Sequence, residues 1–565
     1  MKKEKVFWDS RMSFILASMG SAIGLGNIWR FPFVCYKHGG GAFLIAYLIA
    51  LFVAGIPLLI LEFAIGHRTG GSAPFGFSKI NFTYKGNIEN KEVKKNKGTF
   101  EWIGWFALFI GFFITTYYTV IMGWSVNYIW HSIKMSWVGF EGGPEGFFYN
   151  NILHLTKHVF DIGKIQIPIV IGLFISWIWI VLSIWKGAKT VSKVVYVTVG
   201  LPWFLLIVFV IRGVSLPGAI EGIKYYLVPN FSKLLDLQLW HAAFSQIFFS
   251  LSVGFGVMIA YASFLPSKSD VASNAIIIAL ADAATAYIGG FAVFSAIGYY
   301  AQTLGKPVEE VLKSGPHLAF VTYPEIISKL PLAPVFGVLF FLMLLTLAID
   351  SAFSLVEGVV AGLMDKFNIK RSVANIGVGV VAFVIGLIFV TGAGLYWLDI
   401  TDHFMNFFGL FVVGFLEAIV IGYAFSTEDM RKYINSVSKI KIGKWWIYAI
   451  KYAVPLVSFT LIFFSLRDIL YKGYSGYPAL ALFIGGWLPL IIAILGAYFL
   501  TKMKIPWKIL LLTILIIVIV VFLKYFNLLS YINKYIPQNI LLIFIFVLAT
   551  GTIFGIIVWG LMKSK

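Results

Sequence analysis

The chain has 565 residues, of which 60% are hydrophobic and only 12% are charged. Soluble domains are nearer half apolar and a quarter charged, so this composition excludes a soluble enzyme or nucleic-acid-binding protein and predicts an all-α polytopic membrane protein. The formal net charge is +19, and its distribution favours anionic lipid over nucleic acid as the partner. The single cysteine, Cys35, excludes a disulfide within the chain and a cysteine-rich metal site.

About fourteen stretches are long and apolar enough to cross a bilayer, which takes about 20 residues each. In chain order they are residues 12–37, 41–67, 102–130, 167–184, 194–212, 243–264, 272–300, 334–364, 374–391, 399–424, 446–467, 479–500, 507–525 and 539–562. Residues 1–11 are basic and polar, and no small-residue cleavage site follows them, which predicts a retained end rather than a signal peptide.

The distribution of lysine and arginine predicts the orientation. An even number of spans places both termini on one side of the membrane. If that side is the cytoplasm, inside segments hold roughly 28 of the 44 basic residues and outside loops roughly 15. We therefore expect a multi-pass plasma-membrane protein whose amino and carboxyl termini are both cytoplasmic.

Glycines interrupt two of the spans at membrane depth. The first span contains Gly20, Gly24 and Gly26 in GSAIGLGNIWRFP, and the sixth contains Gly254 and Gly256 in QIFFSLSVGFGVMIAYASF. Each glycine costs a helix about 1 kcal/mol, and irregular backbone persists in a bilayer only where it is buried in protein or lines a cavity. Glycine also occurs at tight helix crossings, but paired breaks one five-span unit apart indicate a transporter built from inverted repeats.

A broken helix suits ions of both signs. The amino-terminal end of one half offers free N–H groups to an anion such as a carboxylate. The carbonyl groups left at the carboxyl end of the other half suit a hard cation such as sodium. An amino acid zwitterion together with sodium fits both ends.

Three segments, occurring in this order, carry a resemblance to a known family. Residues 20–32, residues 39–66 (GGGAFLIAYLIALFVAGIPLLILEFAIG) and residues 246–256 (QIFFSLSVGFG) resemble the neurotransmitter:sodium symporter family, over about residues 5–500. The resemblance implies the LeuT fold, an inverted 5+5 helix repeat in which helices 1 and 6 are broken. It also implies sodium-coupled symport by alternating access.

The resemblance divides the chain as follows: a cytoplasmic amino terminus (1–11), a first five-helix repeat (12–212), a second, inverted repeat (243–424), helices 11 and 12 (446–500) and two extra carboxyl-terminal helices (507–562). No chemistry is evident in the last two helices.

The implied substrate site uses Ala22, Leu25, Gly26, Ile114, Tyr118, Phe249, Ser250, Ser252, Phe255, Ala352 and Leu355. The amides of Leu25 and Gly26 and the hydroxyl of Tyr118 would bind the substrate carboxylate. Gly24 leaves room for that carboxylate, where members that carry monoamines have an aspartate. The uncharged far end favours a neutral, apolar, leucine-like amino acid, with aromatic amino acids (Trp, Tyr or Phe) as the alternative.

Two sodium sites are implied. The first comprises Ala22, Asn27, Ser250 and Asp282 with the substrate carboxylate, and the second comprises Gly20, Ile23, Leu347, Asp350 and Ser351. A charge inside a span costs at least about 2.5 kcal/mol without a partner. No basic residue lies within two turns of Asp350, so sodium is its expected partner rather than an unseen lysine or arginine.

Position 282 departs from the family pattern. Asparagine is common there, with a serine or glutamate one turn later, whereas this chain has Asp282 and then Ala286. A permanent carboxylate would supply the negative charge that chloride supplies in other members, so we expect that chloride is not required. Whether Asp282 also carries a proton on the return step stays open.

The resemblance also implies two gates. Arg30 and Asp402 would pair on the outer side, directly or through water, and Lys5 and Asp365 on the inner side, where ordinary solvated charges are the alternative. Glu62, an intramembrane carboxylate, is expected to cap the broken backbone.

Other classes fit the sequence less well. The chain has no nucleophile–base pair, metal-ligand spacing or nucleotide motif, which argues against an enzyme. A channel would need a continuous polar stripe, and a substrate sensor that kept the transporter fold would need a signalling domain. The expected partners are a small-molecule amino acid and the lipid bilayer, with no nucleic acid, and the chain could be a monomer or a dimer.

Overall fold

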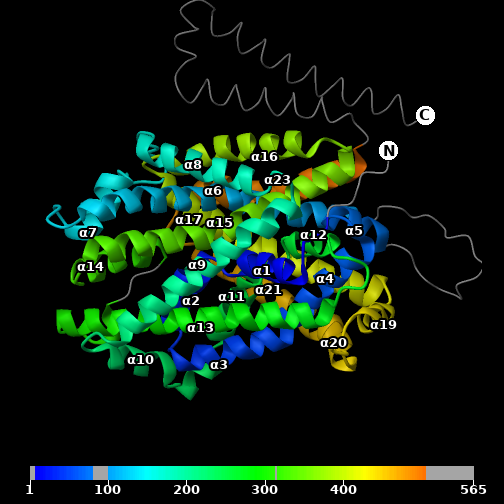
Figure 1. The fold of residues 1–565 in the computed structure, drawn as a ribbon, viewed down its shortest axis with the longest axis horizontal. Coiled ribbons are helices and arrows are strands. Elements are labelled where there is room, and N and C mark those ends of the chain that lie inside the picture. Colours follow the sequence, from blue (N-terminus) through cyan, green and yellow to red (C-terminus); the bar gives the residue numbers. More distant parts are fainter. Residues whose placement is uncertain (1–6, 81–99, 312–314, 504–565) are drawn as a thin grey trace, which may run out of the picture.

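The computed structural model describes residues 7–80, 100–311 and 315–503, and this part of the chain is almost entirely helical (Figure 1). Within the described residues, extended pairing is limited to two isolated bridges. The spans expected at 507–525 and 539–562 lie outside the described residues.

The helices of the first half are α1 Arg11–Ala22, α2 Phe31–Lys37, α3 Gly41–Ala50, α4 Ile56–Thr69, α5 Ala73–Ile80, α6 Glu101–Lys134, α7 Gly143–Gly146, α8 Ile167–Ser183, α9 Ala188–Val214 and α10 Ala219–Leu227. Those of the second half are α11 Leu237–Ser250, α12 Val257–Ser263, α13 Val271–Leu304, α14 Tyr323–Ser328, α15 Ala333–Phe367, α16 Arg371–Gly386, α17 Gly394–Phe404, α18 Phe411–Ile419, α19 Thr427–Val437, α20 Lys444–Tyr448, α21 Val454–Lys472, α22 Ala479–Leu482 and α23 Leu488–Lys502. Short π-type turns join several of them into longer helices, as η2 Leu51–Gly55 joins α3 to α4.

Nine helices of the described part are long and apolar enough to cross a membrane, and a bent pair makes a tenth. The nine are Gly41–Thr69, Glu101–Lys134, Ala188–Val214, Val271–Leu304, Ala333–Phe367, Arg371–Val390, Gly394–Ala424, Lys444–Lys472 and Ala479–Lys502. Each overlaps a stretch expected from the sequence. The expected fourth span is the shorter apolar helix α8, and the total of about fourteen spans stays a prediction.

The first span is interrupted where its glycines predict. α1 begins after Ser10, whose hydroxyl accepts the N–H of Ser13 at 3.0 Å and so satisfies one free amide of the first turn. The helix ends at Ala22, the next residue, Ile23, is extended (φ −81°, ψ 97°), and helical turns resume in η1 at Gly26. The two halves are bent by 49°.

The sixth span is also interrupted. α11 ends at Ser250 and α12 begins at Val257, with unwound backbone over 251–256. Gly254 and Gly256 have φ of +82° and +71°, values that are open to glycine but cost most other residues about 1–2 kcal/mol. The glycines therefore allow the helix to unwind here.

The two interruptions face each other and share hydrogen bonds. Ser252 Oγ donates to the carbonyl oxygen of Ser21 at 2.9 Å, and Gln246 Nε2 donates to that of Gly26 at 3.3 Å. The carbonyl group of Ser21, at the break in the first span, thus finds a donor on the sixth, as buried backbone in a bilayer requires.

α4 supports the broken sixth span from one side. A Cβ at Gly66 would overlap the carbonyl oxygen of Ile259, so α4 and α12 pack backbone against backbone. One turn earlier, Glu62 Oε1 accepts the N–H of Gly254 at 2.5 Å. The prediction that Glu62 caps broken backbone is confirmed for the sixth span.

An ion pair anchors the long helix α15, which packs along α6. Glu357 on α15 is fully buried and accepts two hydrogen bonds of 2.6 Å from Arg371 at the start of α16. Arg371 also donates to the carbonyl oxygen of Ile184, just beyond α8, at 3.2 Å. These contacts fasten three helices together at one point.

Candidate functional site

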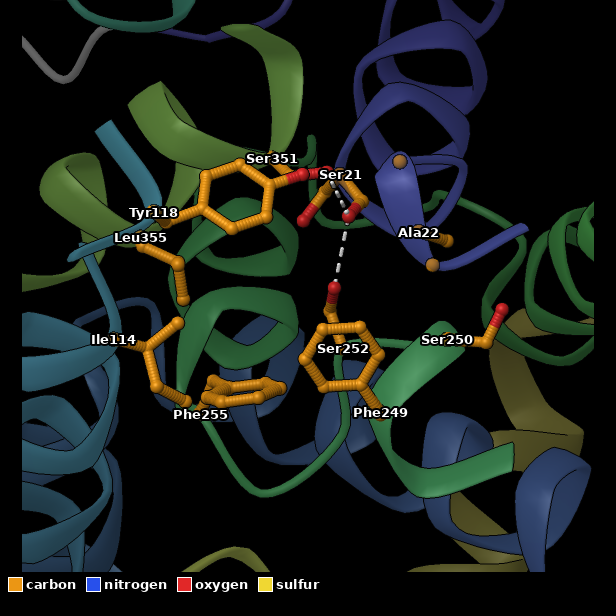
Figure 2. Close-up of a pocket in the computed structure, with 12 residues that line it drawn as sticks. Ser21, Ala22, Ile114, Tyr118, Phe249, Ser250, Ser252, Phe255, Ser351 and Leu355 are labelled. Carbon is orange, nitrogen blue, oxygen red and sulfur yellow. Dashed lines mark hydrogen bonds between the residues drawn. The ribbon is translucent and has the colours of Figure 1, made fainter. Parts of the chain in front are cut away.

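A cavity lies where the two interruptions meet α6 and α15 (Figure 2). It is lined by Ser21, Ala22, Gly24, Gly26, Ile114, Tyr118, Phe249, Ser250, Ser252, Phe255, Ser351 and Leu355. All the predicted substrate residues line this cavity except Leu25 and Ala352. The structure therefore brings the predicted set together, while the role of each residue stays a prediction.

The two exceptions are each next to lining residues in the sequence, Leu25 between Gly24 and Gly26 and Ala352 directly after Ser351. The N–H of Leu25 donates to the hydroxyl of Tyr118 at 3.3 Å, so this amide is aimed at a residue that lines the cavity. Ala352 directly follows the lining residue Ser351 on α15 and is fully buried. The structure thus joins the backbone of Leu25, through its N–H group, to a residue of the cavity wall.

One end of the cavity is polar. A Cβ at Gly24 would lie 2.6 Å from Ser351 Oγ and 3.1 Å from Tyr118 Oη, so any side chain at position 24 would occupy the space beside these hydroxyls. Ser21, which sequence reasoning missed, also lies here, and its carbonyl oxygen accepts from Ser252 and from Ser351, the latter at 3.1 Å. Only its place at the break could have indicated it, because its backbone makes these contacts.

The other end of the cavity is apolar. Ile114, Phe255 and Leu355 gather on one side in Figure 2, and the ring of Phe249 lies across from them. No charged side chain is among the lining residues. A ligand with a polar head and an apolar body matches this division.

Asp282 forms the centre of the first predicted cation site. Asn27 Nδ2 donates to Asp282 Oδ1 at 2.8 Å, and Ser250 Oγ lies 2.9 and 2.8 Å from the two carboxylate oxygens. Tyr47 Oη completes the group at 3.5 Å. The carboxylate is fully buried and, among the described residues, has only these neutral donors, so its environment suits a cation.

Asp350 forms the centre of the second predicted site. Thr198 Oγ1 donates to Asp350 Oδ1 at 2.6 Å, and a Cβ at Gly20 would lie 2.6 Å from Asp350 Oδ2. Ser351 Oγ lies 3.4 Å from the carbonyl oxygen of Gly20. The carboxylate therefore points at the carboxyl-terminal end of α1, where carbonyl oxygens are concentrated.

The remaining members of the second set frame that end of α1. Ile23 is the extended residue that directly follows α1, and Leu347 lies on α15, one helical turn before Ser351. Oxygen donors of this kind, a carboxylate, a hydroxyl and carbonyls, fit a hard cation such as sodium.

The outer gate residues do not pair directly in this structure. Arg30 Nη2 donates to Ser245 Oγ at 3.0 Å, and the guanidinium lies 4.7 Å from the centre of the Phe249 ring. Asp402 instead accepts from Tyr117 Oη at 2.8 Å. Each gate residue therefore has other partners.

The inner gate is described only in part. Asp365 Oδ2 accepts the N–H of Ser72 at 2.8 Å, which ties α15 to the segment after α4. Lys5 lies outside the described residues, so its pairing with Asp365 stays a prediction.

Comparison with known proteins identifies relatives across most of the chain. A family model described as "Sodium:neurotransmitter symporter family" matches residues 5–142 and 140–528. The chain is 42% identical over 503 residues to an "Uncharacterized sodium-dependent transporter" of Methanocaldococcus jannaschii, covering 89% of this chain and 98% of that one. It is 32% identical over 515 residues to the human "Sodium- and chloride-dependent GABA transporter 2", covering 84% and 83%.

A solved structure shows that the fold is similar as well. The crystal structure of MhsT in complex with L-phenylalanine is similar, with a TM-score of 0.69 and 31% sequence identity, covering 81% of this chain and 99% of that chain. The relatives are transporters, in line with the prediction that this protein is not an enzyme. The resemblance drawn from the sequence is thus confirmed, and the chain belongs to the sodium:neurotransmitter symporter family, a family of sodium-dependent, multi-pass membrane transporters.

Proposed function

We propose that this protein carries a neutral, apolar amino acid of leucine-like shape across the plasma membrane together with sodium, by alternating access. The two-ended cavity supports this proposal. The amide of Leu25 and the hydroxyl of Tyr118 meet at one end, where they would bind a carboxylate. Ile114, Phe255 and Leu355 would enclose an aliphatic side chain at the other.

An aromatic amino acid is the second candidate. The structure of the solved relative is of its complex with L-phenylalanine. That relative is 31% identical to this chain, and the similarity covers 99% of the relative's own chain. Acidic and basic amino acids fit poorly, because the cavity lining offers no charged side chain to pair with them.

Two sodium ions would accompany each substrate. Asn27, Ser250 and Asp282 would hold the first ion beside the substrate carboxylate, and Asp350 and Ser351 would hold the second against α1. An ion that touches the substrate must raise its affinity, and linkage makes the effect reciprocal. Sodium would also draw the broken end of α1 toward α15, which orders the binding site.

We further infer the repeat organisation and the orientation. Residues 12–212 and 243–424 would form two inverted five-helix repeats, because the interruptions fall in the first helix of each. The basic residues on and after α19, among them Lys432, Lys439 and Lys441, support a cytoplasmic location for both termini.

The purified full chain should bind one or more neutral amino acids in sodium and none in potassium. A thermal-shift screen of the twenty amino acids, run in each salt, measures this, with leucine and phenylalanine separating the two substrate classes. Potassium has the same charge but a larger radius, so it controls for ionic strength. Failure to bind any amino acid in sodium would contradict the proposal.

Wild-type uptake should persist when chloride is replaced by gluconate. Uptake by the Asp282→Asn variant should be at least about tenfold lower in gluconate than in chloride, a difference equivalent to about 1.4 kcal/mol. The physical reason is that Tyr47, Ser250 and Asn27 would lose the fixed negative charge they now surround, and chloride could replace it. Uptake of radiolabelled amino acid into proteoliposomes measures the effect, with Asp399→Asn as the matched control. Collapse of wild-type uptake in gluconate would contradict chloride independence.

A further inference from the structure

Thr198 is a buried hydroxyl on a helix that does not line the substrate cavity. It lies on α9, which packs against α1, α13 and α15, and it is only 3% exposed. Apart from Ser192 and Thr198, the buried face of α9 consists of apolar side chains, one proline and one glycine. A hydroxyl on such a face has lost its hydration and needs a partner within the protein.

The partner of this hydroxyl is the Asp350 carboxylate. Thr198 Oγ1 lies 2.6 Å from Asp350 Oδ1 on α15 and 3.2 Å from the carbonyl oxygen of Val194, one turn earlier on α9. A hydroxyl has one hydrogen to donate. The shorter distance is typical of an O–H group that donates to a carboxylate, and such charge-assisted bonds are stronger than bonds to a neutral carbonyl. The hydrogen of Thr198 therefore points to Asp350.

Asp350 depends on this one hydrogen bond, whereas the carboxylate of the other predicted sodium site has several. Asp282 accepts hydrogen bonds from side chains on three different elements, those of Asn27, Ser250 and Tyr47. Within the described part of the chain, Thr198 is the only side chain that donates to Asp350. Three neighbours fix the orientation of the first carboxylate, and a single neighbour fixes that of the second.

The hydrogen bond determines which way the other oxygen of Asp350 points. With Oδ1 bonded to Thr198, Oδ2 lies 2.6 Å from the place that a Cβ of Gly20 would take, at the carboxyl-terminal end of α1. The carbonyl donors predicted for the second sodium ion are at this end. A ligand oxygen that is held in place before the ion arrives loses less freedom when the ion binds.

We propose that Thr198 is a positioning residue for the second sodium ion. It holds the Asp350 carboxylate in the orientation in which Oδ2 faces the end of α1, and it does not itself touch the ion. This inference rests on the proposed function, because it assigns a residue to a sodium site proposed there. It adds α9 to the helices on which sodium affinity depends.

Sodium titration of the purified, substrate-free full chain, followed by tryptophan fluorescence, tests the inference. Thr198→Val removes the hydroxyl but keeps the shape of the side chain, and it should lower sodium affinity roughly tenfold, equivalent to about 1.4 kcal/mol. Thr198→Ser restores the donor and should bind sodium as the wild type does. Thr198→Ala also lacks the donor, should show the same loss, and replaces Thr198→Val if that variant folds poorly.

The matched control is Thr346→Val. Thr346 is also 3% exposed and lies on α15, one turn before Asp350. Its hydroxyl is close only to carbonyl oxygens of its own helix, those of Leu342 at 2.8 Å and Met343 at 3.0 Å. Thr346→Val should therefore bind sodium with wild-type affinity, and a loss as large as that of Thr198→Val would overturn the inference.

A double-mutant cycle separates positioning of the carboxylate from a general effect on packing. In an Asp350→Asn background, Thr198→Val should cause almost no further loss of sodium affinity, because the carboxylate on which Thr198 acts is absent. A loss that comes from altered packing of α9 would persist in this background.

The outcomes distinguish this inference from the proposed function. Wild-type affinity in Thr198→Val, a loss that Thr198→Ser does not recover, or a loss that persists without Asp350 overturns the inference and leaves the proposed function intact. A wild-type chain that binds no sodium in the same titration overturns both.

Discussion

Replacing Asp350 with asparagine should weaken sodium binding by about a hundredfold or more. The carboxylate is buried, receives one hydrogen bond from Thr198 and points at Gly20. In the proposed mechanism its charge is balanced by sodium, because no basic residue of the described chain pairs with it. Removing one partner of a buried charge pair costs roughly 3 kcal/mol or more, and each 1.4 kcal/mol is a factor of ten in affinity.

Sodium titration of the purified protein, followed by tryptophan fluorescence or by radioactive sodium binding, measures this loss. Asp399→Asn is the matched control, since Asp399 is also largely buried but accepts from Tyr474 and Tyr477 at 3.0 Å each. It should bind sodium as the wild type does. An Asp350→Asn variant with wild-type sodium affinity would remove the second sodium site from the mechanism.

Replacing Glu357 with alanine should lower the free energy of unfolding by about 3–5 kcal/mol. The substitution leaves the Arg371 guanidinium without the carboxylate that accepts its two 2.6 Å hydrogen bonds. An uncompensated buried charge is the reason for a loss of this size. Equilibrium unfolding in mixed micelles, followed by tryptophan fluorescence, gives the change.

Two further variants separate lost charge pairing from lost packing. The double variant Glu357→Met with Arg371→Met should recover most of the loss, because apolar side chains of similar volume replace a buried pair well. Glu221→Ala removes the partner of Lys224 in an exposed pair and should change stability by less than about 1 kcal/mol. The interpretation fails if Glu357→Ala is no more destabilising than Glu221→Ala.

The broken helices could be predicted because glycine has a physical signature in the sequence. Gly254 and Gly256 adopt positive φ, as their spacing indicates. Ser252 also has a positive φ, of +53°, and nothing in its side chain predicts that conformation. It is held by its hydrogen bond to Ser21, a contact between segments more than two hundred residues apart.

Helix ends were predicted less well than helix centres. The sixth span was expected to begin at residue 243, but α11 begins at Leu237, where the side chain of Asp236 accepts the N–H of Gln238 at 2.9 Å. A helix that extends beyond the bilayer is stabilised by such polar caps, which hydropathy does not register.

Contacts between distant side chains could not be read from the sequence. The Arg30–Asp402 gate was expected from family resemblance, yet the direction of the guanidinium depends on the aromatic rings that surround it. Glu62 was expected to cap broken backbone, but the amide that it binds, that of Gly254, could not be named from the sequence. The two residues meet only when α4 packs against the sixth span in the folded chain.

The direct backbone contact between Gly66 and Ile259 holds α12 closely against α4. With no side chain interposed, α4 and α12 cannot separate slightly without opening a gap too narrow for water or lipid, and the attraction across it would be lost. The helix α12 is therefore held against α4, and the unwound residues between Ser250 and Val257 separate it from α11. In the proposed alternating-access cycle, α12 would move together with α4, and the unwound residues would let α11 keep its position.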